Sequence, residues 1–116
     1  MEGMKKIFLI IIILNSSLIL PASYWIHGAG YSTCDKFSLT AKLPLASPDT
    51  KQIMMEYSSW IQGFISALNM QYQSDVGEGM SWLELWYEVQ EKCEKKPKQD
   101  VLDATLEVFF ELKDQG

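Results

Sequence analysis

The sequence contains no arginine and only one histidine, His27. Arginine is the side chain best suited to hold phosphates and carboxylates through paired hydrogen bonds. From Tyr24 onward the chain has 14 acidic residues and 8 lysines, a net charge of −6. Binding to nucleic acid or to anionic lipid rests on positive charge. We therefore expect no nucleic-acid partner and no membrane contact for the mature chain.

The residues that build catalytic and metal sites are equally scarce. A single histidine in a lead-in segment does not supply the positioned base of a Ser-His-Asp or Cys-His arrangement. The turn over 77–79 is too short for a dinucleotide-binding loop, and no cluster has the ligand spacing of a zinc site. Glu84, Glu88 and Glu91 have helical spacing beside lysines, which predicts a solvated face. We expect no catalytic residue, no metal and no cofactor, and so no enzyme.

Long apolar runs are confined to the N-terminus. Two lysines precede the apolar run within residues 5–20, and small residues follow it. This layout predicts a signal peptide over 1–23, and hence an exported protein, periplasmic or secreted if the chain is bacterial. Cleavage sites between 22 and 30 are open, after Ala22, Ser23 or Gly30. The alternative is an uncleaved anchor over 7–26, which is long enough to span a bilayer. Residues 31–116 are expected to form a single domain.

The chain has two cysteines, Cys34 and Cys93. In an exported protein an even pair predicts a disulfide, because the compartment is oxidising. Closing a loop of about 60 residues would stabilise so small a domain by roughly 4 kcal/mol. The alternative is two free thiols.

Apolar spacings of three and four residues predict helices, and no segment alternates as a strand does. A short helix is expected from Cys34, and a long central helix from Pro48 with Ser47 as its N-cap. A third is expected after Ser81, ending before Pro97, and a last one over about 99–113. Residues 24–33 are expected to be an exposed or loosely docked lead-in. The fold class predicted is a small all-α bundle of four helices tied by the Cys34–Cys93 disulfide.

The central helix carries a notch of small residues at Ser59, Gly63 and Ala67. Glycine in a helix interior lowers stability by up to about 1 kcal/mol relative to alanine, so its presence there calls for a structural explanation. The spacing of four predicts a groove into which another helix of the fold docks, with Gly63→Leu strongly destabilising.

Aromatic side chains are the other candidates for a role. The helical phase of Trp60, Phe64, Trp82 and Trp86 predicts that they are core residues. The alternative is that at least one tryptophan is partly exposed and binds a partner, as aromatics at contact surfaces do.

Three segments, 33–37 (TCDKF), 63–69 (GFISALN) and 89–93 (VQEKC), resemble the HdeA/HdeB family of acid-stress proteins. The resemblance covers nearly all of the exported part. It implies a periplasmic, helical, disulfide-tied protein that is a dimer near neutral pH. It also implies that acid opens the protein, which then shields unfolding client proteins with its apolar surface. A weaker likeness, to immunity proteins of type VI secretion amidases, implies a module that binds and inhibits a cell-wall amidase toxin.

Overall fold

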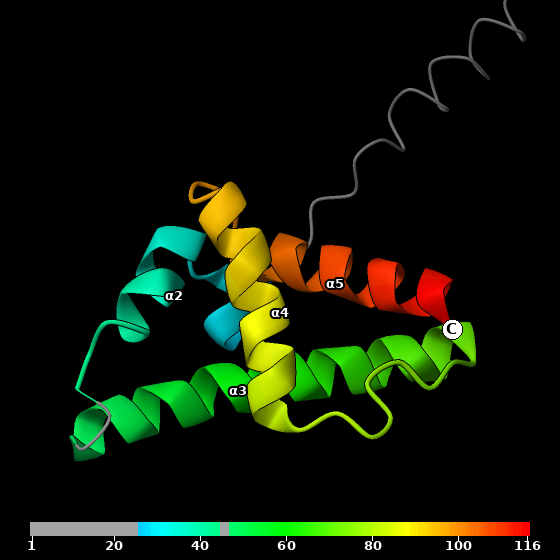
Figure 1. Ribbon diagram of the computed structural model, residues 1–116, viewed down its shortest axis with the longest axis horizontal. Coiled ribbons are helices and arrows are strands. Elements are labelled where there is room, and N and C mark those ends of the chain that lie inside the picture. The colour runs from blue at the N-terminus through cyan, green and yellow to red at the C-terminus, as the bar shows by residue number, and fades with distance from the viewer. Residues whose placement is uncertain (1–25, 45–46) are drawn as a thin grey trace, which may run out of the picture.

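Four α-helices and one short 3-10 turn make up the described part of the chain. The computed structural model describes residues 26–44 and 47–116 (Figure 1). In chain order the elements are η1 (Gly28–Tyr31), α2 (Cys34–Thr40), α3 (Pro48–Tyr72), α4 (Trp82–Lys95) and α5 (Val101–Gln115). Between these described residues the β-type pairing is limited to one isolated bridge, Thr33 with Asp100. The predicted all-α class with a short first helix is confirmed.

The starts of α4 and α5 have side-chain capping bonds, whereas Thr33 before α2 and the predicted N-cap Ser47 before α3 occupy the N-cap position without one. α3 begins at the predicted residue, Pro48. At α4, Ser81 Oγ accepts a hydrogen bond from the Glu84 backbone N–H at 3.2 Å. At α5, the Asp100 carboxylate accepts from the Asp103 N–H at 2.8 Å. Each cap satisfies a donor that has no partner inside its own helix.

The end of α3 is fixed by Asn69, the last residue of the GFISALN segment. Its side-chain carbonyl oxygen accepts hydrogen bonds from Ser74 Oγ and from the Val76 N–H, each at 2.9 Å. Its Nδ2 donates to the Val76 carbonyl at 3.0 Å. Gln73, at the C-cap, takes the left-handed conformation with φ of 51°. One side chain therefore holds the turn that leads from α3 toward α4.

An aromatic cluster joins three helices at the centre of the core. Figure 1 shows α3 as the long base, with α4 crossing it and α5 running above it. Phe37 of α2, Tyr57 of α3 and Trp86 of α4 are buried, with ring centroids 4.4 to 6.1 Å apart. Such rings dominate core energetics through the area they bury. Around them pack the buried residues Ile61, Ile65, Leu68, Leu85, Val89, Val101, Ala104, Val108 and Phe109.

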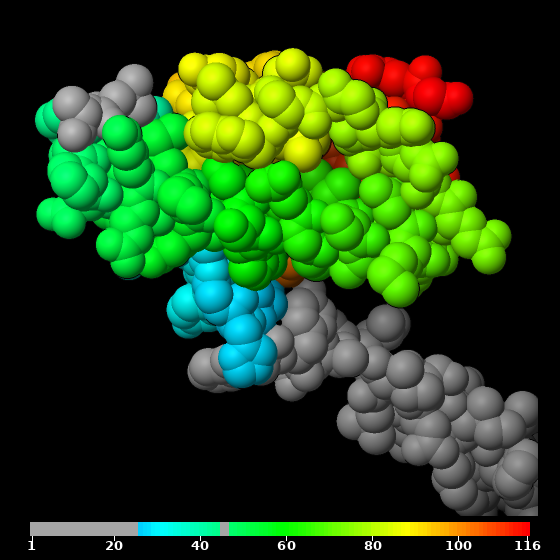
Figure 2. Space-filling view, turned by 90° about the horizontal axis from the view of Figure 1, so that it is seen from below, coloured from blue at the N-terminus to red at the C-terminus, as the bar shows by residue number. Residues whose placement is uncertain are grey.

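The lead-in before α2 is docked on the fold. Trp60 Nε1 donates to the His27 carbonyl at 3.0 Å, and Gly30 is buried against the same ring. Figure 2 shows this segment on the side of α3 opposite α4. The prediction of an exposed or loosely docked lead-in is therefore wrong for Gly30, which is buried, while Gly28 and Tyr31 are exposed. The packed domain begins before residue 31.

The small-residue notch of α3 is open to solvent. Ser59, Gly63 and Ala67 are all exposed, and a Cβ added at Gly63 would meet no atom within 4 Å. The prediction of a docking groove inside the fold is wrong. Ile61 and Ile65 set the buried side of α3, and Gly63 lies about 200° around the helix from each of them. The close approach that needs a glycine occurs instead at Gly30, where a Cβ would collide with the Trp60 ring.

Two alanine substitutions should therefore act in opposite directions. Gly63→Ala should stabilise the protein by up to about 1 kcal/mol, because alanine favours helix and its methyl group meets open space. Gly30→Ala should destabilise it by about 1–3 kcal/mol, because Trp60 must move. Urea unfolding of the two variants measures both changes. Destabilisation by Gly63→Ala, or a neutral Gly30→Ala, would contradict this account of the packing.

Candidate functional site

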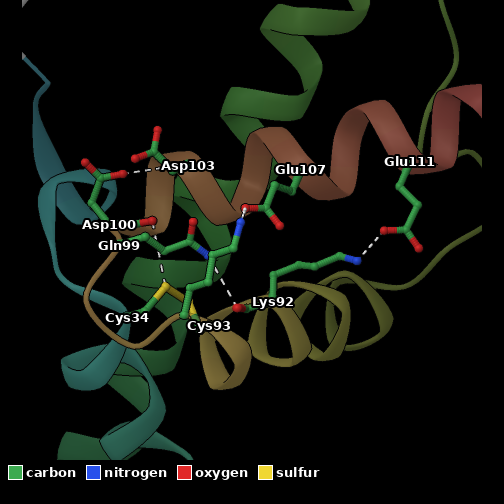
Figure 3. Close-up of polar contacts among 9 residues, drawn as sticks. Cys34, Lys92, Cys93, Gln99, Asp100, Asp103, Glu107 and Glu111 are labelled. Carbon is green, nitrogen blue, oxygen red and sulfur yellow. Dashed lines mark hydrogen bonds and ion pairs between the residues drawn. A yellow bond between two sulfur atoms is a disulfide. The ribbon is translucent and has the colours of Figure 1, made fainter.

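The disulfide lies where α2, α4 and α5 meet. Cys34 opens α2, Cys93 is in the last turn of α4, and the predicted bond between them is present and buried (Figure 3). Beside it the Cys34 N–H donates to the Gln99 carbonyl, and the Val101 N–H donates to the Ser32 carbonyl, both at 2.8 Å. The segment before each of these two helices, α2 and α5, thus supplies a carbonyl partner for a donor that the start of the other leaves unpaired. We call this arrangement the disulfide corner.

Two ion pairs join the outer flanks of α4 and α5. Lys92 pairs with Glu111, and Lys96 pairs with Glu107 at 3.3 Å (Figure 3). Each lysine is four residues from the other, as is each glutamate, so the pairs form an antiparallel ladder. The hydrogen bond from Lys92 lowers the pKa of Glu111, and the same bond raises the pKa of Lys92. The Lys92–Glu111 pair therefore contributes to the attachment of α5 only while the Glu111 carboxyl group is ionised.

At the start of α5, the carboxyl group of Asp103 has a pKa that is shifted upward, opposite to the shift of Glu111. Partial burial raises the pKa of Asp103, and the negative charges of Asp100 and Glu107 raise it further. A raised carboxyl pKa means that folding is less favourable once the group ionises. Protonation of Asp103 thus stabilises the start of α5, whereas protonation of Glu111 loosens its far end.

The predicted aromatic residues lie in different environments. Trp86 is 2 % exposed and belongs to the core. Trp60 is half-buried and stacks on Phe64, with ring planes 13° apart and centroids at 5.0 Å. Trp82 is 44 % exposed in the first turn of α4. The core prediction is confirmed for Trp86, and Trp82 is available to a partner.

Sequence reasoning missed two neighbours of Trp82. Leu83 and Tyr87 lie one turn apart on α4 and are 36 % and 59 % exposed. The helical phase that buries Trp86 and Val89 leaves positions 83 and 87 turned away from the core, which was the available signal. We call Trp82, Leu83 and Tyr87 the α4 ridge. Leu83 and Tyr87 share one side of α4, as residues four apart do, whereas Trp82 lies about 140° around the helix from Tyr87. Exposed aromatic residues are enriched at contact surfaces.

An apolar hollow of about 440 Å³ opens between η1, α3 and α5. The stacked Trp60 and Phe64 rings and leucines of α3 and α5 form most of its wall. Among the described residues, no Asp, Glu or Lys side chain lines it. Its lining residues are Ile26, His27, Trp60, Phe64, Leu68, Gln71, Leu102 and Leu106.

The described residues offer no constellation for metal chemistry. Over 26–44 and 47–116 no group of three or more His, Cys, Asp or Glu side chains is placed to hold a metal ion.

Comparison of the chain with family models, curated proteins and solved structures found no match. None of the helices in those ranges combines the length and the apolar content needed to span a bilayer. The expected signal peptide, like Trp25, lies outside the described residues. The candidate sites are therefore surfaces: the ladder, the α4 ridge and the hollow.

Glu111→Gln should lower stability slightly at neutral pH and leave it unchanged in strong acid. A carboxyl group with a lowered pKa stabilises the fold above its ordinary pKa of about 4.3, and that contribution is lost as pH falls through the folded value. Urea midpoints at about pH 7 and pH 2 measure the difference. Glu91→Gln is the control, because its pair with Lys95 lies within α4 and joins no other helix. A Glu111→Gln deficit that persists in strong acid would contradict the assignment.

Proposed function

We propose that this protein is an exported, non-enzymatic protein-binding module that acts in the periplasm as an acid-stress chaperone. The observation that carries the proposal is the unequal attachment of its helices. The Cys34–Cys93 disulfide ties α2 to α4 covalently. Beyond core packing and the corner, α5 is joined to α4 by the carboxylates of Glu107 and Glu111. Acid neutralises the second attachment and leaves the first intact.

The change of net charge in acid also favours opening of the fold. With its 14 carboxyl groups protonated, the chain from Tyr24 onward would change from −6 to about +8, His27 aside. Like charges then repel one another across the molecule and loosen the compact state. The 8 lysines include both lysines of the ladder, which are left without partners.

Loosening α5 exposes the surface that a chaperone needs. Its inner face is buried against the other helices through Val101, Leu102, Ala104, Val108 and Phe109. Apolar surface released into water associates with the apolar surface of other unfolding proteins. Because α2 and α4 stay linked, the chain keeps a folded half from which α5 can dock again when the pH returns to neutral. The resemblance to HdeA/HdeB proteins supports the same proposal.

A second candidate function is an immunity-type protein that binds and inhibits a secreted cell-wall amidase. The α4 ridge favours it, because Trp82, Leu83 and Tyr87 are exposed in the folded protein at neutral pH. Glu84 and Glu91 flank the ridge on the same helix and are exposed. Exposed aromatic side chains with acidic neighbours suit a folded partner that presents an apolar pocket in a basic rim.

Light scattering of an aggregating client protein across about pH 2–7 tests the chaperone proposal. The protein should suppress aggregation below an onset pH and have no effect above it. The double variant Glu107→Gln/Glu111→Gln should move that onset to higher pH, because its ladder is already broken. Glu91→Gln should leave the onset unchanged.

Lack of suppression at any pH would refute the chaperone function. Suppression with the same onset in both variants would refute the role of the ladder. The immunity-type alternative predicts instead a one-to-one complex with an amidase at neutral pH, weakened at least tenfold by Tyr87→Ala, and no effect on the client.

A further inference from the structure

The two sulfur atoms of the disulfide are buried beside the chain that leads into α5. Cys34 and Cys93 are both 0 % exposed. The Asp100 carbonyl oxygen lies 3.7 Å from Cys34 Sγ (Figure 3). Residues 97–101, which lead from α4 into the first turn of α5, therefore lie against the bond. We call them the cover segment.

Hydrogen bonds fix the cover segment to both helices that carry the cysteines. Toward α2, the Gln99 carbonyl accepts from the Cys34 N–H at 2.8 Å. The Pro97 carbonyl accepts from the Asp35 N–H at 2.9 Å. Toward α4, the Gln99 side-chain Nε2 donates to the carbonyl of Lys92, in the last turn, at 3.3 Å. The cover segment is thus held in place on both sides of the disulfide.

We propose that thiol–disulfide exchange at the Cys34–Cys93 bond requires the cover segment to move away, and that a disulfide-bearing oxidant therefore forms the bond before α5 docks. In exchange, a thiolate must touch one sulfur atom and bond to it, while the other sulfur leaves as a thiolate. Neither sulfur presents exposed surface to such an attack in the folded protein. Formation of the bond follows the same steps in reverse, so the cover segment obstructs it equally.

The oxidation balances with a disulfide as the electron acceptor. One cysteine thiolate attacks the disulfide of the oxidant, which forms a mixed disulfide and releases one thiol. The second cysteine thiolate then attacks the mixed disulfide at the sulfur of the first cysteine, which closes the bond and releases a second thiol. Two electrons and two protons pass from the cysteines to the oxidant. The first step requires a cysteine sulfur that the oxidant can touch, and the docked cover segment prevents that contact.

Asp100 connects the cover segment to the stability of α5. Its carboxylate caps α5 by accepting from the Asp103 N–H at 2.8 Å, while its carbonyl lies beside the sulfur. Asp100→Ala removes the cap, so the cover segment should leave the disulfide more often. Asparagine caps a helix about as well as aspartate, so Asp100→Asn should keep the cover segment in place. This exchange chemistry concerns the folded protein at neutral pH and does not depend on a chaperone role.

Reduction of the oxidised full chain by dithiothreitol at about pH 7 measures the exchange rate, with alkylation of the freed thiols and mass spectrometry as the readout. The folded protein should react more slowly than the protein in concentrated urea by at least about a hundredfold, because the disulfide is reached only in open states. Asp100→Ala should speed the reaction roughly fivefold, and Asp100→Asn should leave it nearly unchanged.

Asn69→Ala is the matched control, because Asn69 holds the turn after α3 and not the cover segment. It should lower the urea midpoint without faster reduction. Equal rates in the folded and the urea-unfolded protein would overturn the proposal, since the sulfurs would already be accessible. So would an Asp100→Ala rate equal to that of the unchanged protein or of Asp100→Asn. Acceleration by Asn69→Ala in proportion to its loss of stability would show that reduction follows complete unfolding instead.

Discussion

The rest of the structure depends on the disulfide corner. The Cys34–Cys93 bond fixes the start of α2 against the end of α4. The Cys34 and Val101 amides, each bonded at 2.8 Å to a carbonyl across the corner, hold the start of α5 in the same place. A chain of this size buries only a small apolar core, so a covalent bond between two helices accounts for a large part of its net stability. The aromatic cluster of α2, α3 and α4 then packs against this fixed point.

Away from the corner, α5 packs on α3 through Tyr72, Phe109 and Phe110, and its ion pair with α4 is the contact that depends on pH. The Lys92–Glu111 pair lies toward the far end of α5 and is lost when its carboxyl group is protonated. At the near end the pKa of Asp103 is raised, so that acid relieves repulsion there. Acid should therefore release α5 from its C-terminal end first, while its first turn stays with α2 and α4. Because acid affects Asp103 and Glu111 in opposite ways, we expect α5 to open from its C-terminal end toward its first turn.

Much of the fold can be predicted from the sequence, because it rests on local chemistry. Helix starts follow from Pro48 and Ser81, and the disulfide follows from an even cysteine count in an exported chain. The errors concern which side of α3 other elements approach. Gly63 was assigned to packing because a glycine in a helix needs a reason, but Ile61 and Ile65 turn it to solvent. The docking of Gly30 on Trp60 could not be predicted, because a short irregular segment has no periodicity to reveal a buried side. The exposure of Leu83 and Tyr87 was predictable from helical phase, whereas that of Trp82, which shares a face of α4 with the buried Trp86, was not.

Amide hydrogen exchange of the oxidised protein at about pH 4 tests the central role of the corner most directly. The amides of Cys34, Asp35 and Val101, which donate to carbonyls across the corner at 2.8 to 2.9 Å, should be among the most protected. Those in the last two turns of α5 should be the first helical amides to lose protection, because opening starts there. Equal protection of the two sets, or earlier loss at the corner, would contradict the claim that the corner holds the fold while α5 opens.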